Sequence, residues 1–232
     1  MKKIVVFTGA GVSADSGIAT FRDSDGLWAN YRIEDVCTPQ ALSSNRAQVI
    51  DFYNARRKEL LTKEPNAGHK ALCRLSEKYD VEIVTQNIDD LHERAGSTRV
   101  THLHGELRKL RSSMDEMATV PIEGWQQKLN VRHADGSLLR PFVVFFGEGV
   151  PMLEKAIDIV RSADILIVVG TSLAVYPAAS LVHYVKDSTV PIYLVDPADR
   201  AISNISNKVI HIKERSAIGV PKLVDQLLSI CL

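Results

Sequence analysis

The sequence predicts an α/β fold, in which a parallel sheet is covered by helices on both faces. Short runs rich in Val and Ile recur along the 232 residues, and they lack the clean alternation of half-exposed strands. Segments with helical spacing lie between these runs. Prolines stand where three of the helices could begin, a position that tolerates proline because the first helical N–H has no partner.

The elements can be placed along the chain from these patterns. The expected strands are 3–7, 81–85, 164–169, 190–195 and 208–212, and the expected helices are 39–61, 66–79, 151–163, 177–187 and 221–231. Pro151, Pro177 and Pro221 would stand in the first turns of the last three helices. Residues 23–38 are polar and are expected to form a loop. Residues 108–139 interrupt the rhythm and are expected to form a small lobe inserted into a single domain that spans 1–232.

Composition and charge limit the classes of function. Lys plus Arg and Asp plus Glu each number 28, so a zero net charge gives no indication of a nucleic-acid or membrane partner. Cys37, Cys73 and Cys231 lie far apart and form no CxxC pair, which is typical of a reduced, cytoplasmic chain. The first apolar run is too short for a signal peptide, and no apolar stretch approaches the roughly 18 residues of a membrane span.

The stretch VVFTGAGVSADSGIATFR, residues 5–22, breaks from a strand into small residues. Gly9, Gly11 and Ala14 have the spacing G-x-G-x-x-A, which permits a tight turn and the close approach of phosphate oxygens to backbone. An ordinary turn from strand to helix is the alternative. The acidic residue that ends the second strand of a dehydrogenase fingerprint is absent, because that region is the loop DSDGLW. We therefore expect a pyrophosphate site on a Rossmann-like sheet that differs from a simple dehydrogenase.

Small or polar residues also follow three other expected strands. Gln86-Asn87-Ile88-Asp89, Gly170-Thr171-Ser172 and Asp196-Pro197 each come directly after an apolar run. Ligands of open parallel sheets bind in the crevice at the carboxyl ends of the strands. Four such strand ends together favour a nucleotide site.

The segment THLHGEL, residues 101–107, contains two alternating histidines. On a strand, His102 and His104 would face the same way. One of them could be a general base, because histidine titrates near neutral pH, and the alternative is that both are structural. A zinc site is disfavoured, because these histidines and His133 lack cysteine or carboxylate companions at ligand spacing.

Five segments together resemble the motifs of the sirtuin family of NAD-dependent protein deacylases. They are GAGVSADSGIATFR, TQNIDDLHERAG, HLHGEL, RPFVVFFGE and VVGTSLAVYPAA, and they follow the family order over nearly the whole chain. The resemblance is to the class III bacterial and mitochondrial type, which has Thr-Phe-Arg in the first motif and a Tyr-x-x-Arg pair on a helix. Here that pair is Tyr53 and Arg56.

The resemblance implies which residues bind NAD. Backbone N–H groups and a hydroxyl of Gly9, Ala10, Gly11 and Ser13 would hold the pyrophosphate, with Phe21 covering the nicotinamide side and Arg22 near the phosphates. Gln86, Asn87, Ile88 and Asp89 would form the nicotinamide pocket, in which Asn87 and Asp89 supply the polar contacts at the reacting centre. Gly170, Thr171 and Ser172 would bind phosphate or ribose, and Asp196 would lie near the adenosine. Leu194 stands near a position where the family often has an asparagine facing the ribose.

The resemblance also implies the reaction and the partners. The acyl-lysine oxygen attacks the ribose carbon as nicotinamide leaves, His104 acts as general base, and the acyl group ends on ADP-ribose. A substrate peptide would add as a strand between Phe146-Gly147-Glu148 and the loop 172–176, which includes Val175. The partners would be acyl-lysine proteins or peptides, and the chain would be a monomer or a weak oligomer.

Tyr53 and Arg56 are spaced i, i+3 and therefore share one helix face. An acyl group that ends in a carboxylate, such as succinyl, would suit this pair, since arginine can bind a carboxylate with two hydrogen bonds. The alternative is a packed tyrosine and a solvated arginine within the basic run RRK.

The chain departs from the family in the small lobe, where most sirtuins hold zinc with four cysteines. Residues 108–139 contain no cysteine, and Ser112 and Ser113 stand where the first pair would begin. We expect no zinc or other metal, and a lobe that is held by packing of Met114, Met117, Val120, Trp125 and Leu129.

Two other classes remain open at this point. One is a different NAD chemistry, either ADP-ribosyl transfer to protein or hydrolysis of NAD. The other is a non-catalytic NAD-binding protein.

Overall fold

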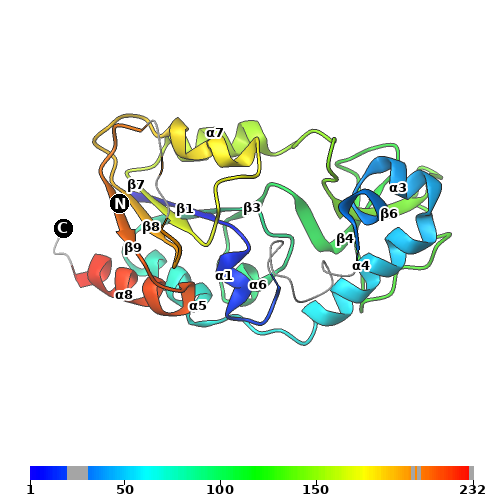
Figure 1. Ribbon diagram of the computed structural model, residues 1–232, viewed down its shortest axis with the longest axis horizontal. Helices are drawn as coiled ribbons and strands as arrows, with labels where there is room; N and C mark the ends of the chain where they lie inside the picture. The colour runs from blue at the N-terminus through cyan, green and yellow to red at the C-terminus, as the bar shows by residue number, and fades with distance from the viewer. Residues whose placement is uncertain (20–30, 200–201, 203–204, 230–232) are drawn as a thin grey trace.

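The computed structural model describes residues 1–19, 31–199, 202 and 205–229, and its largest element is a parallel sheet (Figure 1). Within these residues the sheet has six strands in the order β3-β2-β1-β7-β8-β9. The strands are β1 Lys3–Thr8, β2 Asp80–Thr85, β3 Val100–His102, β7 Ile165–Val169, β8 Ile192–Val195 and β9 Val209–Ile212. The central strand β1 is paired with β2 on one side and with β7 on the other.

Helices cover both faces of this sheet (Figure 1). Helices α5 (Ala67–Arg74) and α8 (Ser216–Ser229) pack on one face, and α7 (Leu153–Arg161) and the 3₁₀ helix η3 (Ala178–Tyr184) pack on the other. The strand β1 is buried on both sides, because Val5 and Phe7 join one apolar core while Ile4 and Val6 join the other. This arrangement explains why the strand sequences lack alternation, and it confirms the predicted fold class.

A second group of elements lies at the other end of the molecule (Figure 1). They are the helices α2 Ile33–Val36, α3 Pro39–Ser44 and α4 Arg46–Leu60, and an antiparallel sheet of order β5-β4-β6 made by Thr119–Pro121, Gly105–Ser112 and Leu139–Val143. Three short helices complete the described chain, namely α1 Gly11–Ala14, η2 Leu75–Glu77 and α6 Leu91–Arg94. A third apolar core, which includes Phe52, Tyr53 and Phe145, joins α4 to the strand β6 and the segment after it.

Several element boundaries differ from the sequence prediction. The helix expected over 39–61 is two helices, because the backbone of Asn45 leaves the helical conformation after the first, and its side chain caps the second by accepting a hydrogen bond from the Gln48 N–H at 3.3 Å. The helix expected over 177–187 is a 3₁₀ helix of seven residues. The last helix begins at Ser216, so Pro221 lies inside it and not in its first turn. The segment expected to be a loop contains α2, and its residues 23–30 lie outside the described part of the chain.

The small lobe has a different core from the one predicted. Leu110, Ile122 and Leu139 are its buried residues, and Val120 packs against them. Met114, Met117, Trp125 and Leu129 are exposed, so the prediction was wrong for these four residues. They lie in connections between the strands, where the side chains have no apolar layer to face.

Hydrogen bonds around Asp135 join the two ends of this lobe. The Ser112 hydroxyl donates to Asp135 Oδ2 at 2.6 Å, and the Ser137 N–H donates to Asp135 Oδ1 at 2.8 Å. The Ser112 oxygen also accepts from the N–H groups of Met114 and Asp115. This cluster therefore ties the end of β4 to the turn that precedes β6.

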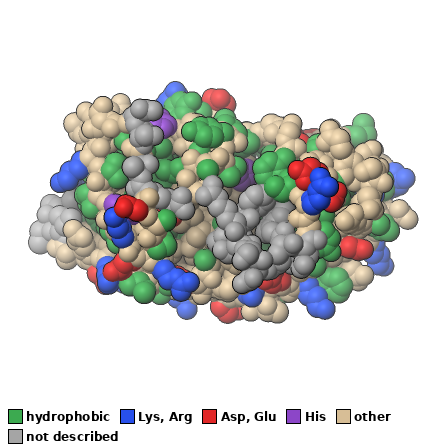
Figure 2. All heavy atoms as spheres, viewed as in Figure 1, with side chains coloured by type: hydrophobic (Ala, Val, Ile, Leu, Met, Phe, Trp, Pro, Cys, Tyr) green, Lys and Arg blue, Asp and Glu red, His purple; other side chains and the backbone are tan. Residues whose placement is uncertain are grey.

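The surface in Figure 2 carries Lys and Arg side chains interspersed with Asp and Glu. Among the helices that the structure describes, none is both long enough and apolar enough to cross a membrane.

We predict that Asp135→Ala loosens the small lobe without unfolding the parallel sheet. Hydrogen bonds from Ser112 and Ser137 lower the pKa of this carboxyl, so its stabilising contribution is full above the ordinary Asp pKa of about 4 and is lost as the pH falls below it. Hydrogen exchange at neutral pH should show faster exchange in 112–138 and unchanged protection in β1 and β7. Glu123→Gln, at an exposed carboxylate of the same lobe, is the control. Equal protection in the variant and the wild type would contradict a structural role for Asp135.

Candidate active site

A cavity of about 630 Å³ lies at the carboxyl ends of the parallel strands and extends toward α4. Every site residue expected from the sequence and present in the described part of the chain lines this cavity. They are Gly9, Ala10, Gly11, Ser13, Tyr53, Arg56, Gln86, Asn87, Ile88, Asp89, His104, Phe146, Gly147, Glu148, Gly170, Thr171, Ser172, Val175 and Asp196. Phe21 and Arg22 lie outside the described residues.

The floor of the cavity is formed by backbone at the ends of β1 and β7. The Gly9 N–H donates to Val169 O at 3.0 Å and the Gly11 N–H donates to Gly170 O at 2.8 Å. A Cβ atom on Gly11 would stand 2.7 Å from Gly170 Cα, and Gly170 has a φ of +58°. Side chains are excluded at this contact, so a pyrophosphate could approach the backbone of the cavity floor closely.

This geometry refines the role expected for the first motif. The N–H groups of Gly9, Gly11 and Ser13 all donate to backbone carbonyls. These three N–H groups are therefore already bonded within the protein, contrary to the expectation that they hold the pyrophosphate, and what they contribute to the cavity is its shape.

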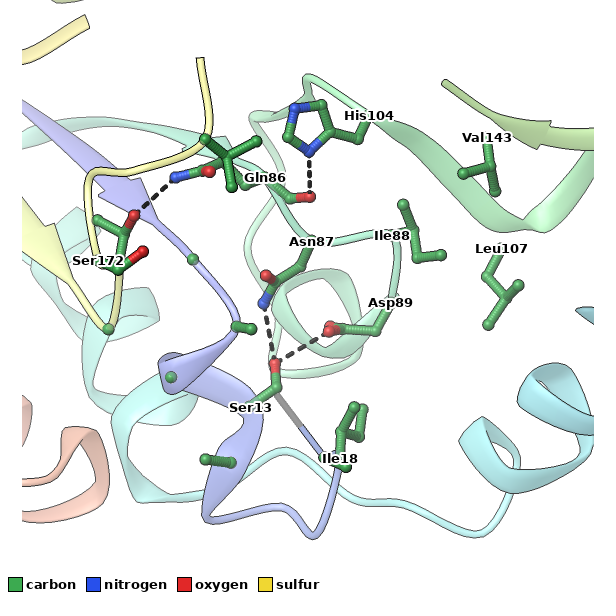
Figure 3. Close-up of a pocket in the computed structure, with 18 of the residues that line it drawn as sticks. Ser13, Ile18, Gln86, Asn87, Ile88, Asp89, His104, Leu107, Val143 and Ser172 are labelled. Atoms are coloured by element: carbon green, nitrogen blue, oxygen red, sulfur yellow. Dashed lines mark hydrogen bonds between the residues drawn. The ribbon is translucent and has the colours of Figure 1, made fainter. Parts of the chain in front are cut away.

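Ser13, Asn87 and Asp89 form a buried polar cluster at one side of the cavity (Figure 3). The Ser13 hydroxyl donates to Asp89 Oδ2 at 2.9 Å and accepts from Asn87 Nδ2 at 3.1 Å. Burial raises the pKa of Asp89, while hydrogen bonds from the Leu91 N–H and the Ser13 hydroxyl act against this. The cluster presents an amide and a carboxylate to a ligand that enters the cavity.

Gln86 connects two strand ends across the cavity. Its Nε2 donates to Thr171 Oγ1 at 2.9 Å, which links the residue after β2 to the loop after β7. Asp196, after β8, is buried and accepts a hydrogen bond from the Ala198 N–H at 2.9 Å. Leu194 is wholly buried in the apolar core under the sheet, so β8 reaches the cavity through Asp196 and not through Leu194.

The structure separates the two histidines of THLHGEL. His102 has its Nδ1 2.8 Å from Asn87 O and its Nε2 2.8 Å from Glu93 Oε1, so both ring nitrogens face acceptors. Burial by itself lowers the pKa of His102, but these partners outweigh it and raise the pKa. His102 is thus a structural group that holds the segment after β2.

His104 has the opposite character. Its Nδ1 lies 2.9 Å from Gln86 O, and because a carbonyl only accepts, Nδ1 carries the hydrogen. This fixes the tautomer and leaves a lone pair on Nε2. Burial lowers the pKa of His104, although the Gln86 carbonyl raises it, so the ring is neutral at pH 7. A neutral, oriented imidazole in the wall of a cavity can accept a proton (Figure 3).

The carboxylate of Glu148 is engaged within the protein. Arg140 donates to it at 2.6 and 3.1 Å, and the Phe145 N–H donates to its Oε2 at 2.7 Å. The Arg140 guanidinium also lies over the Phe145 ring at 3.9 Å. Glu148 therefore organises the segment 145–148, which presents the exposed Phe146 at the cavity.

Tyr53 and Arg56 reach the cavity from α4, as their spacing predicts. Tyr53 is wholly buried, and its ring stacks on Phe145 with centroids 5.8 Å apart. The Arg56 guanidinium carbon lies 5.8 Å from the centroid of the Phe52 ring.

The next residue, Arg57, faces the small lobe and is also wholly buried. It donates to Leu107 O at 2.9 Å, to Asn54 Oδ1 at 2.7 Å and to Trp125 O at 3.2 Å. Burial lowers its pKa to about 10, so it remains charged at neutral pH. The basic run RRK is thus divided between the cavity and the lobe.

Some lining residues were not expected from the sequence. Cys37 lines the cavity beside Tyr53, and Arg215 and Ser216 line it from the start of α8. No local pattern marks these residues, because their places depend on packing between distant segments. His69 and His92 are buried, and their rings lie 4.9 Å apart. Neither is among the described lining residues, and the nearest hydroxyls are those of Ser13, 3.4 Å from His69 Nε2, and Thr8, 3.0 Å from His92 Nε2.

The cavity has a glycine floor and lies between β1 and β7, where the strand order reverses. This arrangement is typical of nucleotide-binding α/β proteins. The family model described as Sir2 family matches residues 9–177, and the chain belongs to this family.

Named relatives agree with that assignment. An NAD-dependent protein deacylase of Aggregatibacter actinomycetemcomitans is 57% identical over 198 residues, which cover 85% of this chain and 94% of the relative. One of Bacteroides thetaiotaomicron is 46% identical over 233 residues and 98% of each chain. A solved Sir2 homologue in complex with NAD has a TM-score of 0.86 at 38% identity, over 98% of this chain and 90% of the other.

Proposed function

We propose that this protein removes acyl groups from protein lysines in an NAD-dependent reaction that gives nicotinamide and O-acyl-ADP-ribose. The proposal rests on one observation about His104. The bond to Gln86 O holds this residue as its Nδ1–H tautomer, in the wall of the cavity that Asn87 and Asp89 also line. Relatives with this fold carry the name NAD-dependent protein deacylase. A non-catalytic NAD-binding protein would have no need of a neutral, oriented imidazole.

The cavity fits NAD in shape and in donor set. The contact between Gly11 and Gly170 keeps side chains away from the floor, where the pyrophosphate would lie. Asn87 and Asp89 would hold the carboxamide of nicotinamide, and Asp196 would stand at the adenosine end. When bound, NAD supplies the ribose carbon to which the acyl oxygen is transferred.

The part of His104 is to accept a proton at Nε2 from a ribose hydroxyl. Its lowered pKa keeps this nitrogen unprotonated at neutral pH, and Gln86 O keeps the ring oriented. Activity that depends on this base is lost as the pH falls through the pKa of His104. Gln86 is itself held by Thr171, so the base is positioned by the same strand ends that form the nucleotide site.

The substrate peptide would lie along the segment 145–148, whose shape is set by the Arg140–Glu148 pair. Contacts of Phe146, Gly147 and Val175 with the peptide would involve mostly backbone and apolar surface, which gives loose sequence preference. Glu148 would act through the conformation of this segment.

We assign Tyr53 and Arg56 to the recognition of an acyl group that ends in a carboxylate, such as succinyl. A guanidinium can bind a carboxylate bidentately, and a phenol can donate one more hydrogen bond. Both residues line the cavity, and Arg56 supplies the positive charge.

Three further properties belong to the same proposal. The protein would work in the cytoplasm, which suits the free thiols of Cys37 and Cys73. It would be a monomer or a weak oligomer with acyl-lysine proteins as partners. Its small lobe would be held without zinc by the core around Leu110 and the cluster around Asp135. Within the described residues, no three His, Cys, Asp or Glu side chains are grouped so that they could hold a metal.

We expect nicotinamide release from NAD to require an acyl-lysine peptide, and His104→Ala to lower turnover by about 10²- to 10⁴-fold, because a positioned base contributes this much. The measurement is the rate of nicotinamide release with acetyl-lysine, succinyl-lysine and unmodified peptides. NAD affinity of the variant, measured by calorimetry, is the control and should change little. Release that is independent of the peptide would indicate an NAD hydrolase or ADP-ribosyltransferase, and no release would indicate a binding protein.

Replacement of Arg56 by Met should lower desuccinylation far more than deacetylation. A charge-assisted hydrogen bond is worth about 1.5–3 kcal/mol, so kcat/KM for the succinyl peptide should fall by about 10- to 100-fold. Lys58→Met removes an exposed charge two residues along α4 and is the matched control. Equal losses on the two substrates would make Arg56 a structural residue.

Elemental analysis of the purified protein should find much less than one zinc per chain, and chelator treatment should leave the melting temperature unchanged. Stoichiometric zinc would contradict the assignment of the small lobe.

A further inference from the structure

A thiol and a phenol meet in the wall of the cavity. The Tyr53 hydroxyl donates a hydrogen bond to Cys37 Sγ at 3.2 Å, and both residues line the cavity. Tyr53 is wholly buried and Cys37 is 5% exposed, and both lie directly behind the surface that a ligand in the cavity would meet. Arg56, on α4, lines the same cavity, and its positive charge acts to lower the pKa of both the thiol and the phenol.

The backbone of Cys37 is held on both sides. Its N–H caps the end of α2 by donating to Ile33 O, and its carbonyl accepts a hydrogen bond from the Phe146 N–H at 3.0 Å. Tyr53 is fixed by its stacking on Phe145. The Cys37 backbone and the Tyr53 ring are therefore held near each other by contacts that do not depend on the bond between sulfur and hydroxyl.

Burial raises the pKa of the Cys37 thiol, although its hydrogen bond from Tyr53 acts against this. The residue is a neutral thiol at pH 7 and not a nucleophilic thiolate. What it offers to its surroundings is a weak acceptor of hydrogen bonds.

We propose that Cys37 determines how strongly the acyl pocket prefers chains that end in a carboxylate, because its sulfur holds the Tyr53 hydroxyl only until a carboxylate takes that hydrogen bond. This inference rests on the proposed role of Tyr53 and Arg56 in binding such acyl groups. A carboxylate is a much stronger acceptor than a thiol, so the hydroxyl is transferred from sulfur to the ligand. With a neutral acyl chain, the hydroxyl stays on Cys37.

The sulfur thus competes with the ligand for the hydrogen bond of the Tyr53 hydroxyl. Removal of the sulfur should therefore strengthen the preference for acyl chains that end in a carboxylate. In Cys37→Ala, the Tyr53 hydroxyl lacks its present partner in the empty pocket, and a buried donor without a partner is costly. A carboxylate relieves that cost and a neutral chain does not. The ratio of kcat/KM for a carboxylate-ended chain to that for a neutral chain should therefore rise by about 2- to 10-fold, which corresponds to one net hydrogen bond.

The test compares succinyl-lysine and butyryl-lysine peptides of one sequence, because the two acyl groups have the same number of carbons. The ratio of their kcat/KM values is measured for the wild type, Cys37→Ala, Tyr53→Phe and the double variant. Space opened by the loss of sulfur affects both substrates, and any loss of folded protein cancels from the ratio. Cys73→Ala, at a thiol that does not line the cavity, is the matched control.

We expect Cys37→Ala to raise the succinyl-to-butyryl ratio, mainly through KM, because the end of the acyl chain is remote from the reacting bond. In the Tyr53→Phe background the same change at residue 37 should leave the ratio constant. An unchanged ratio in Cys37→Ala, or an equal change with and without the Tyr53 hydroxyl, would overturn the role of Cys37 while leaving deacylation intact. Wild-type removal of butyryl without removal of succinyl would instead overturn the proposed role of Tyr53 and Arg56, and this inference with it.

A second measurement needs no change at residue 37. Infrared difference spectra of the wild-type protein report the S–H stretching band, which responds to the hydrogen bond that the sulfur accepts. The succinyl peptide should shift this band and the butyryl peptide should not, and an equal response to both would contradict the proposal.

Discussion

The contact between the ends of β1 and β7 is the constraint on which the rest of the site depends. Gly11 and Gly170 approach so closely that neither has room for a Cβ atom, and this closeness forms the floor of the cavity. The same strand ends position Ser13 and Thr171, which in turn hold Asp89 and Gln86. A backbone contact therefore sets the positions of the side chains that would bind the nicotinamide end of NAD.

The two histidines of THLHGEL show how burial and partners divide the roles of one motif. His102 is surrounded by acceptors and has a raised pKa, whereas His104 has one acceptor and a lowered pKa. Both bond to carbonyls of the segment after β2, His102 to Asn87 and His104 to Gln86. The proposed proton transfer and the structural support thus fall to residues two positions apart.

Much of the fold and of the candidate site could be predicted from the sequence, because local patterns mark where the strands of a parallel sheet end. The apolar runs around Val5 and Ile167 and the small residues that follow them indicate both the fold and the edge at which ligands bind. From the residues alone the roles of His104 and His102 could not be separated, because they depend on carbonyl positions, and only the family resemblance pointed to His104 as the base. The core of the small lobe could not be predicted, because Met114 and Trp125 lie in connections that have no periodic pattern. The contact of Cys37 with Tyr53 depends on how α2 packs against α4.

Arg57 also bears on how constant the length of the cavity is. It ties α4, which carries Tyr53 and Arg56, to the carbonyl of Leu107 in β4. His104 directly precedes β4, and the Leu107 N–H donates to Ile88 O at 2.7 Å. The far wall of the cavity and the proposed base are therefore attached to one short stretch of chain, and a buried charge that donates to several acceptors resists separation from them. Arg57 thus acts as a spacer that keeps the distance from His104 to Tyr53 and Arg56 constant.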